Sequence, residues 1–160
     1  MGEDKQIAAI ARHRRHRRHR KSRACNKESA ILCKTGRIEQ KIVSVDKHHE
    51  LRSRAKAFAL RVIRMSQALP RTREANVLSQ QILRSATSMA ANYRAAGRSR
   101  SKAEFVAKLG VVIEEADETV FWLEMLVDGG FVRPKRLEKL QAEANQLLAI
   151  FAASRRTAKE

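Results

Sequence analysis

The chain has 160 residues and a formal net charge of +17 at pH 7. Its low aromatic content of 4%, with only 6 Gly and 2 Pro, favours a helical domain over a β-sandwich or barrel. No apolar run approaches the roughly 20 residues that cross a bilayer. The N-terminus also lacks the apolar core of a secretory signal, so we expect a cytoplasmic protein. The large positive charge makes a polyanionic partner the first candidate.

The positive charge is unevenly distributed along the chain. Residues 1–50 hold 14 Lys and Arg against 6 Asp and Glu, and residues 51–100 hold 11 against 1. Residues 101–160 hold 9 basic residues against 10 acidic ones. The second segment is therefore strongly basic, whereas the third is balanced. This asymmetry is the most informative feature of the charge distribution.

Residues 1–46 differ in composition from the rest of the chain. They include ARHRRHRRHRKSR at 11–23, a low-complexity basic run without apolar periodicity, which predicts a disordered extension. One interpretation is a basic arm that contacts nucleic acid. The interpretation we favour is that the assigned start lies upstream of the true one, with Val45 at an alternative start codon.

The histidines and cysteines of this extension form no recognisable site. His13, His16 and His19 would not all share one helical face, and the arginines between them repel cations. Cys25 and Cys33 lack the spacing of a disulfide framework or a zinc site. We therefore expect two reduced thiols and no bound metal in this segment.

From residue 47 onward, apolar residues recur at steps of three and four, which predicts amphipathic helices. The predicted bundle covers 47–155 and a short tail follows at 156–160, with helices at about 48–69, 73–96, 101–128 and 134–154. Pro70 and Gly129-Gly130 interrupt the pattern, and Ser101 with Glu104 has the form of a capping box. Because the connections are short, we predict an all-α, up-down-up-down antiparallel four-helix bundle.

The predicted bundle lacks the side chains of a catalytic or cofactor site. All five histidines lie at or before His49, so the Glu-x-x-His motifs of a di-iron bundle are absent. Ser85 and Ser88 have no histidine in the bundle that could act as a base. The glycines do not form a phosphate-binding loop. We therefore expect no enzymatic activity, no cofactor and no metal.

Basic side chains gather at the end of the second predicted helix and in the turn after it. The candidate contacts to nucleic acid are Arg84, Arg94, Arg98, Arg100 and Lys102. A second basic group lies on the first predicted helix and its exit. Each contact to a phosphate would make binding more salt-dependent. Two alternatives carry equal weight: a solvated basic surface, or a subunit interface with the acidic third helix of the next copy in a ring.

The third predicted helix offers a candidate oligomer interface, formed by Glu114, Glu118, Phe121 and Trp122. Phe121 and Trp122 are adjacent, so both cannot point into the bundle core. Either they flank the edge of the core, or one of them is an aromatic anchor buried between subunits.

The segment Leu78–Ser101 carries an ordered set of residues that resembles a known family. The order is Gln-x-x-Arg-x-Ala-x-Ser-x-x-x-Asn, followed by Arg-Ser, and it comprises Gln81, Arg84, Ala86, Ser88, Asn92, Arg100 and Ser101. Together with Pro70 and Lys102-x-Glu104-Phe105, it is similar to the bacterial four-helix bundle family of 23S rRNA-intervening-sequence, or S23-type, proteins. The resemblance covers roughly residues 47–155, the size of one domain.

This resemblance implies a basic helical bundle that assembles into a ring, typically a homopentamer, with no established enzymatic activity. It also implies genes that are sometimes lodged in an insertion of the large-subunit rRNA. A related group, the accessory proteins of diversity-generating retroelements, binds a reverse transcriptase and nucleic acid. The chain departs from the commoner family pattern after Asn92, where Tyr93-Arg94-Ala95-Ala96 replaces an apolar residue, a small residue and Glu-Gly. An acidic residue is lost and an arginine is gained.

The sequence thus predicts a non-enzymatic protein associated with RNA, or rRNA, through a basic surface on its first two helices. The alternative is a ring-forming adaptor or scaffold whose basic and acidic surfaces serve self-assembly or partner binding. RNA, DNA and a protein such as a reverse transcriptase are the expected partners.

Overall fold

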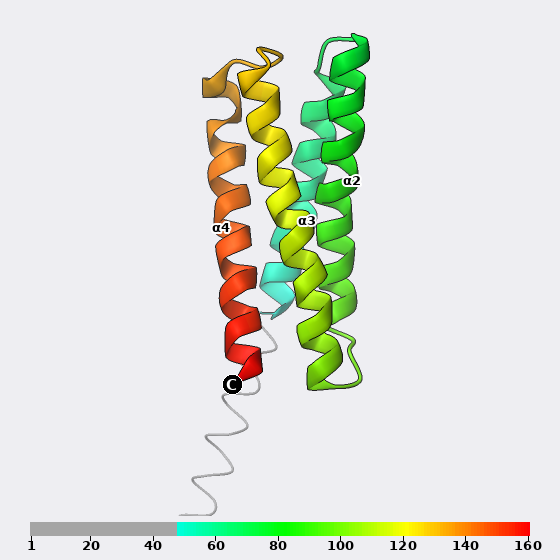
Figure 1. Cartoon of the computed structure of the whole chain (residues 1–160), viewed down its shortest axis with the longest axis vertical. Helices are drawn as coiled ribbons and strands as arrows, with labels where there is room; N and C mark the ends of the chain where they lie inside the picture. Colours follow the sequence, from blue (N-terminus) through cyan, green and yellow to red (C-terminus); the bar gives the residue numbers. More distant parts are fainter. Residues whose placement is uncertain (1–47) are drawn as a thin grey trace, which may run out of the picture. The chain divides into compact units, whose positions relative to one another are not determined.

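The computed structural model describes residues 48–160, and within this range the chain forms four antiparallel helices (Figure 1). The first helix covers 48–67. It is followed by α2 (Arg73–Ala96), α3 (Lys102–Asp128) and α4 (Pro134–Lys159). The predicted up-down-up-down four-helix bundle is confirmed, and no strand occurs in this range. The predictions for residues 1–46 lie outside the described residues.

The bundle has two ends with different connections (Figure 1). One end carries the start of helix 48–67, the turn between α2 and α3, and the C-terminus. The opposite end carries the turn after helix 48–67 and the turn between α3 and α4. We call the first the α2–α3 end and the second the α3–α4 end.

Local capping explains where α2 and α3 begin. The Thr72 hydroxyl accepts a hydrogen bond from the Ala75 N–H at 3.2 Å, and the Ser101 hydroxyl accepts one from the Glu104 N–H at 3.1 Å. Each bond satisfies one of the backbone donors that a helix N-terminus leaves without a partner. The Glu104 carboxylate accepts from the backbone N–H of Arg100 at 2.8 Å, one residue before the position that a capping box uses.

The C-terminal helix is longer than the sequence pattern predicts, whereas the first helix is shorter. Helix α4 continues to Lys159, so most of the predicted tail at 156–160 is helical. No proline or glycine interrupts this segment, and the basic residues of the last turn, Arg156 and Lys159, interact favourably with the helix dipole. Helix 48–67 ends before Ala68, whose N–H donates to the Met65 carbonyl at 3.0 Å in a turn.

The core is formed by the apolar stripes of the four helices. Its largest fully buried side chains come from every helix and include Phe58, Ile82, Leu109, Leu147 and Phe151. Burying a side chain of this size stabilises the fold by roughly 1.5–3 kcal/mol relative to leaving it exposed. All four helices therefore contribute to the stability of one core.

One polar group lies at the edge of this core, near the α2–α3 end. The ring of Tyr93 is 3% exposed and packs 4.9 Å from the ring of Phe151, centroid to centroid. Its hydroxyl is 3.0 Å from Nδ1 of His48 on the first helix. Burial raises the pKa of Tyr93 to about 12, because the charged phenolate loses contact with water.

Candidate nucleic-acid interface

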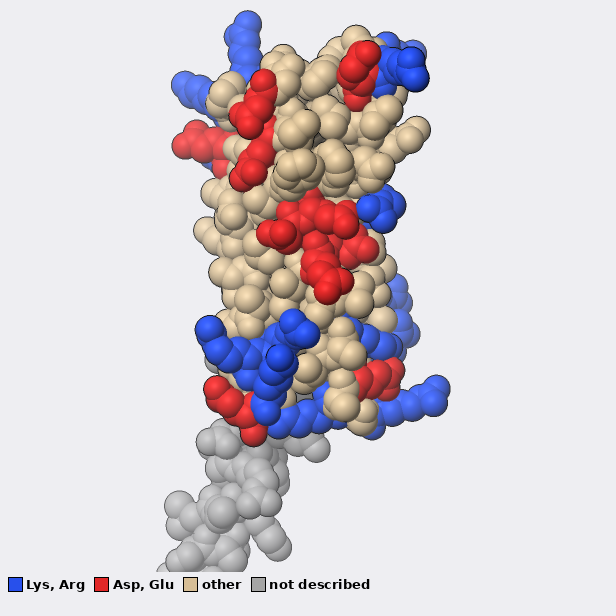
Figure 2. All heavy atoms as spheres, viewed as in Figure 1, with Lys and Arg blue, Asp and Glu red and all other residues tan. Residues whose placement is uncertain are grey.

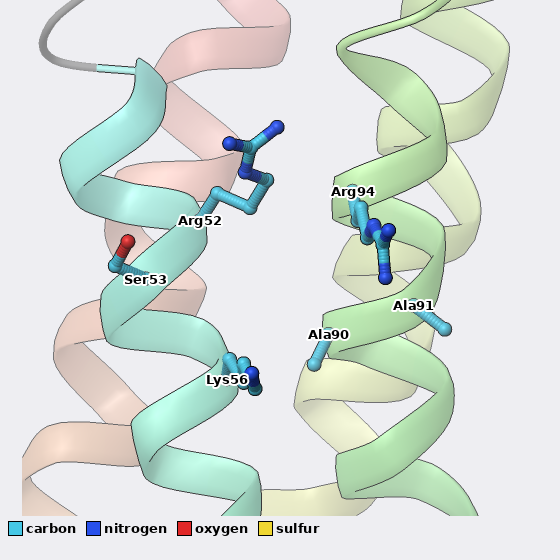
Figure 3. A pocket seen from close by; sticks show the side chains of 6 residues that line it. All are labelled: Arg52, Ser53, Lys56, Ala90, Ala91 and Arg94. Carbon is cyan, nitrogen blue, oxygen red and sulfur yellow. The ribbon is translucent and has the colours of Figure 1, made fainter.

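The structure separates the basic residues of the first helix into two groups with different environments. Arg54 and Arg61 both form ion pairs with Glu143 of α4, and Nε of Arg54 lies 3.5 Å from its carboxylate. Arg54 also donates to the side-chain carbonyl of Gln146 at 2.6 Å. These two arginines therefore link helix 48–67 to α4. Arg52 and Lys56 lie on the side of the same helix that faces α2 (Figure 3).

Arg84 has a partner within the chain and lies apart from the other candidate contacts. Its guanidinium donates to the carboxylate of Glu118 on α3 at 2.9 Å, and both side chains are largely exposed. Ten residues of helix, about 15 Å along the axis, separate Arg84 from Arg94. The structure thus pairs a residue predicted to bind nucleic acid with one predicted to lie in an oligomer interface.

Arg94 faces Arg52 and Lys56 across a surface groove of about 470 Å³ between helix 48–67 and α2 (Figure 3). The small side chains of Ser53, Ala90 and Ala91 complete its lining. We call it the Arg94 groove. None of its lining residues is acidic, and none of its three basic side chains forms an ion pair with any residue of 48–160. Three positive charges therefore line the groove, and no acidic side chain lines it with them.

The same end of the bundle carries three more exposed basic side chains, those of Arg98 and Arg100 in the turn between α2 and α3 and of Lys102, the first residue of α3. The only acidic residue close in sequence is Glu104, and its carboxylate already accepts from the Arg100 backbone and from the Lys108 ammonium at 3.1 Å. These two contacts, the backbone one foremost, hold the pKa of Glu104 below its usual value. Glu104 therefore stays charged without forming an ion pair with the three side chains of the turn.

The helix dipoles favour the position of Arg94 and disfavour the positions of Arg100 and Lys102. Arg94 lies in the last turn of α2, where a positive charge is favourable. Lys102 and Arg100 lie at the start of α3, the positive end of that helix, where a cation is unfavourable. Figure 2 shows Lys and Arg side chains at both ends of the bundle, with acidic ones among them, and an acidic cluster in the middle. The dipole of α3 thus gives no reason for the positive charges of Arg100 and Lys102.

A polar seam between α2 and α3 was missed by the sequence analysis. The Ser88 hydroxyl donates to the Glu115 carboxylate at 2.8 Å, and the Asn92 amide donates to the Ser88 hydroxyl at 3.0 Å. Thr119 donates to the fully buried Ser85 hydroxyl at 3.0 Å. From the sequence, Ser85 and Ser88 are considered only as catalytic candidates. One signal for this contact is present in the sequence. Glu115 and Thr119 are four residues apart on α3, and Ser85 and Ser88 are three residues apart on α2, so each pair lies on one side of its helix.

The seam explains the residues that carry the family resemblance. Arg84, Ser88 and Asn92 contact α3 or the backbone of α2 itself. Their order in the sequence therefore specifies how α2 and α3 pair. The structure gives these three residues a structural role.

The candidate oligomer interface on α3 is only partly an exposed surface. Phe121 is 49% exposed and Glu114 is exposed, whereas Trp122 is half-buried against the core. The two aromatic rings meet edge to face with centroids 4.8 Å apart. Phe121 is thus the aromatic side chain that a partner could cover. Val111 and Met125, which are 41% and 38% exposed, lie on the same helix.

Within residues 48–160 no helix is long and apolar enough to span a membrane. No group of three or more His, Cys, Asp or Glu side chains in that part of the chain is placed to hold a metal ion.

Comparison with known proteins gives a family and solved structures that the chain resembles. One of these structures is from Bacteroides thetaiotaomicron and is described as a protein with unknown function from the S23 ribosomal protein family. It is 29% identical to this chain and superposes with a TM-score of 0.64, covering 69% of this chain and 98% of that one. No curated protein matches. The family model of the 23S rRNA-intervening sequence protein matches residues 47–153, which include all of helices 48–67, α2 and α3 and most of α4. The resemblance noted in Leu78–Ser101 is thereby confirmed, and the chain belongs to the 23S rRNA-intervening sequence protein family.

Proposed function

We propose that this protein is a non-enzymatic, cytoplasmic RNA-associated protein that binds the phosphate backbone at its α2–α3 end. The observation that carries the proposal is the Arg94 groove, which three basic side chains line without an acidic one and without an ion pair to any residue of 48–160. The basic turn at Arg98, Arg100 and Lys102 extends this surface along the same end. The family name links relatives to rRNA, which makes RNA the polyanion to test first.

The composition of the surface predicts which part of the RNA it contacts. Sequence-specific RNA recognition relies on splayed bases that stack on aromatic side chains. No aromatic residue lines the Arg94 groove, and the exposed Phe121 lies on α3, whose middle carries the acidic residues. Arginine and lysine instead contact phosphates irrespective of sequence. We therefore propose backbone binding with little sequence preference and a strong dependence on salt.

A matched pair of substitutions on α2 tests this proposal. Arg94→Gln and Arg84→Gln remove the same charge from the same helix, yet only Arg94 lines the groove. Fluorescence anisotropy with a labelled single-stranded fragment of 23S rRNA, in a salt titration, would measure both. We expect Arg94→Gln to weaken binding by roughly fivefold to tenfold and to lower the salt slope by about 0.7. We expect Arg84→Gln to change the slope little.

Two results would contradict the proposal. One is wild-type binding to RNA that does not weaken as salt increases, because phosphate contacts release counterions. The other is an equal loss of affinity in both variants, which would show that only the total charge matters. Circular dichroism would establish that both variants are folded, which their exposed positions predict.

A second candidate function, a ring-forming adaptor, is favoured by the exposed residues of α3. Val111, Phe121 and Met125 are large apolar side chains left in contact with water, and Glu114 lies on the same helix. Aromatic residues of this kind often anchor subunit interfaces. Sedimentation velocity should then give an oligomer, with a pentamer as the expected size, and Phe121→Ser should dissociate it. A wild-type monomer at physiological salt would rule this function out.

A further inference from the structure

A second groove, of about 930 Å³, lies at the α3–α4 end, opposite the candidate RNA surface. The exit of the first helix contributes one side of it, and the turn and first residues of α4 contribute the other. Its lining residues are Met65, Ala68, Leu69, Gly130, Phe131, Val132, Arg133, Lys135, Arg136 and Leu137. We call it the α4 groove. It differs from the Arg94 groove because its lining includes large apolar side chains, those of Met65, Leu69, Phe131 and Leu137.

The floor of the α4 groove is fixed by the backbone around it. The N–H groups of Phe131 and Val132 both donate to the Leu126 carbonyl at 3.1 Å. Gly130 has a φ of 72°, a conformation that favours glycine. A Cβ at Gly129 would lie 2.7 Å from the Phe131 ring, so glycine is needed for the ring to pack there. These contacts present a preformed apolar surface, as ligand grooves generally are.

The rim of the same groove carries positive charge that the fold does not use. Arg133, Lys135 and Arg136 are exposed, and none forms an ion pair with any residue between 48 and 160. They surround the start of α4, where cations oppose the helix dipole. The first turn of α4 contains no acidic residue, and no side chain caps it. Helix stability therefore gives no reason for placing three cations around this apolar floor.

We propose that the α4 groove binds an acidic peptide segment of a partner protein, whose apolar side chains cover the floor while its carboxylates face the rim. Charge complementarity selects this class of partner, since no lining residue is acidic and the rim is uniformly basic. The apolar floor distinguishes it from the Arg94 groove, where small side chains lie between the cations. A nucleic acid would leave most of this floor uncovered, whereas Leu or Phe side chains would bury it. The proposal is independent of RNA binding at the other end.

The test uses the full-length chain and a synthetic peptide in which Leu and Phe are flanked by Glu, labelled with fluorescein. Anisotropy should show saturable binding of this peptide. Binding should be lost with a matched peptide in which Ser replaces Leu and Phe, and with one in which Lys replaces Glu. The double substitution Arg133→Glu/Arg136→Glu should weaken binding of the original peptide by roughly tenfold or more.

A control variant separates the groove from the total charge of the protein. Arg98→Glu/Arg100→Glu makes the same change of charge at the α2–α3 end, and it should leave peptide affinity within roughly twofold. Ala68→Glu places an acidic side chain at an exposed position in the groove lining and should also weaken binding. Both substituted regions are exposed, so the variants should keep the circular dichroism of the wild-type protein.

Four outcomes would overturn the proposal. The first is no saturable binding of the acidic peptide to the wild-type protein. The second is an equal loss of affinity in the Arg98→Glu/Arg100→Glu control. The third is a loss of RNA affinity in Arg133→Glu/Arg136→Glu without loss of peptide affinity, which would assign the groove to nucleic acid. The fourth is dissociation of an oligomer by that variant in sedimentation, which would assign the groove to a second copy of the chain.

Discussion

The middle and the end of α2 place the same type of side chain in opposite situations. In the middle, Arg84 is paired with Glu118, and Ser85 and Ser88 bind polar groups of α3. At the end, Arg94 faces two further cations across a groove without an acidic residue. Residue type and position on one helix therefore do not distinguish an arginine with an ion-pair partner from one without. The distinction depends on which neighbouring helix the side chain faces.

We expect the largest effect, a loss of stability, from Ser85→Leu, which places a larger side chain in the polar seam between α2 and α3. Ser85 is fully buried and contacts the Thr119 hydroxyl, so a larger apolar side chain would force α2 and α3 apart and leave that hydroxyl without this partner. We expect a loss of about 3 kcal/mol in the free energy of unfolding. Urea unfolding followed by circular dichroism would measure it. A change below roughly 0.5 kcal/mol would mean that the seam is not closely packed.

The same enlargement at the end of α2 should affect binding and leave stability nearly unchanged. Ala91 is exposed and lines the Arg94 groove, so Ala91→Leu fills the space between the basic side chains without entering the core. We expect RNA affinity to fall by roughly threefold to tenfold, because phosphates can no longer approach all three cations. The free energy of unfolding should stay within about 0.5 kcal/mol of wild type. Unchanged RNA affinity would show that RNA binds elsewhere on the protein.

The buried phenol of Tyr93 links the core to the end of α2 and gives a dependence on pH. Its pKa of about 12 in the folded protein lies above the value near 10 expected in the unfolded chain. Folding therefore favours the neutral form of Tyr93. The resulting contribution to the free energy of unfolding is complete below about pH 10 and is lost as the pH rises toward 12. Tyr93 is the only tyrosine of the chain, so phenolate absorbance reports it directly.

Lysines titrate in the same pH range as Tyr93, and a comparison with Tyr93→Phe isolates the effect of the tyrosine. Tyr93→Phe removes the contact to His48 and should lower the free energy of unfolding at neutral pH by about 1 kcal/mol. Between pH 10 and 12 the stability difference between wild type and variant should shrink. A phenolate midpoint near 10 in the folded wild-type protein would show that the hydroxyl remains in contact with water.

The fold could be predicted from the sequence because it depends on apolar spacing and on residues that end helices. Pro70 and Gly130 act through their own backbone geometry, and Ser101 acts through a hydrogen bond to a residue three positions along the chain, so none of them needs a distant partner. The candidate site could be predicted only as a set of basic residues. Whether Arg84 or Arg94 has a counter-charge depends on the rotation of α3 and helix 48–67 about their axes.

The smallest expected effect concerns the ion pair that closes the exposed edge of the polar seam. Arg84 and Glu118 are 61% and 45% exposed in their side chains, so water and salt screen their attraction. A double-mutant cycle with Arg84→Gln and Glu118→Gln should give a coupling of only about 0.2–1 kcal/mol, decreasing at high salt. If the coupling between Arg84 and Glu118 is nearly zero and Arg84→Gln reduces RNA binding, Arg84 belongs to the RNA-binding surface. A measurable coupling with unchanged RNA binding would separate the structural middle of α2 from its binding end.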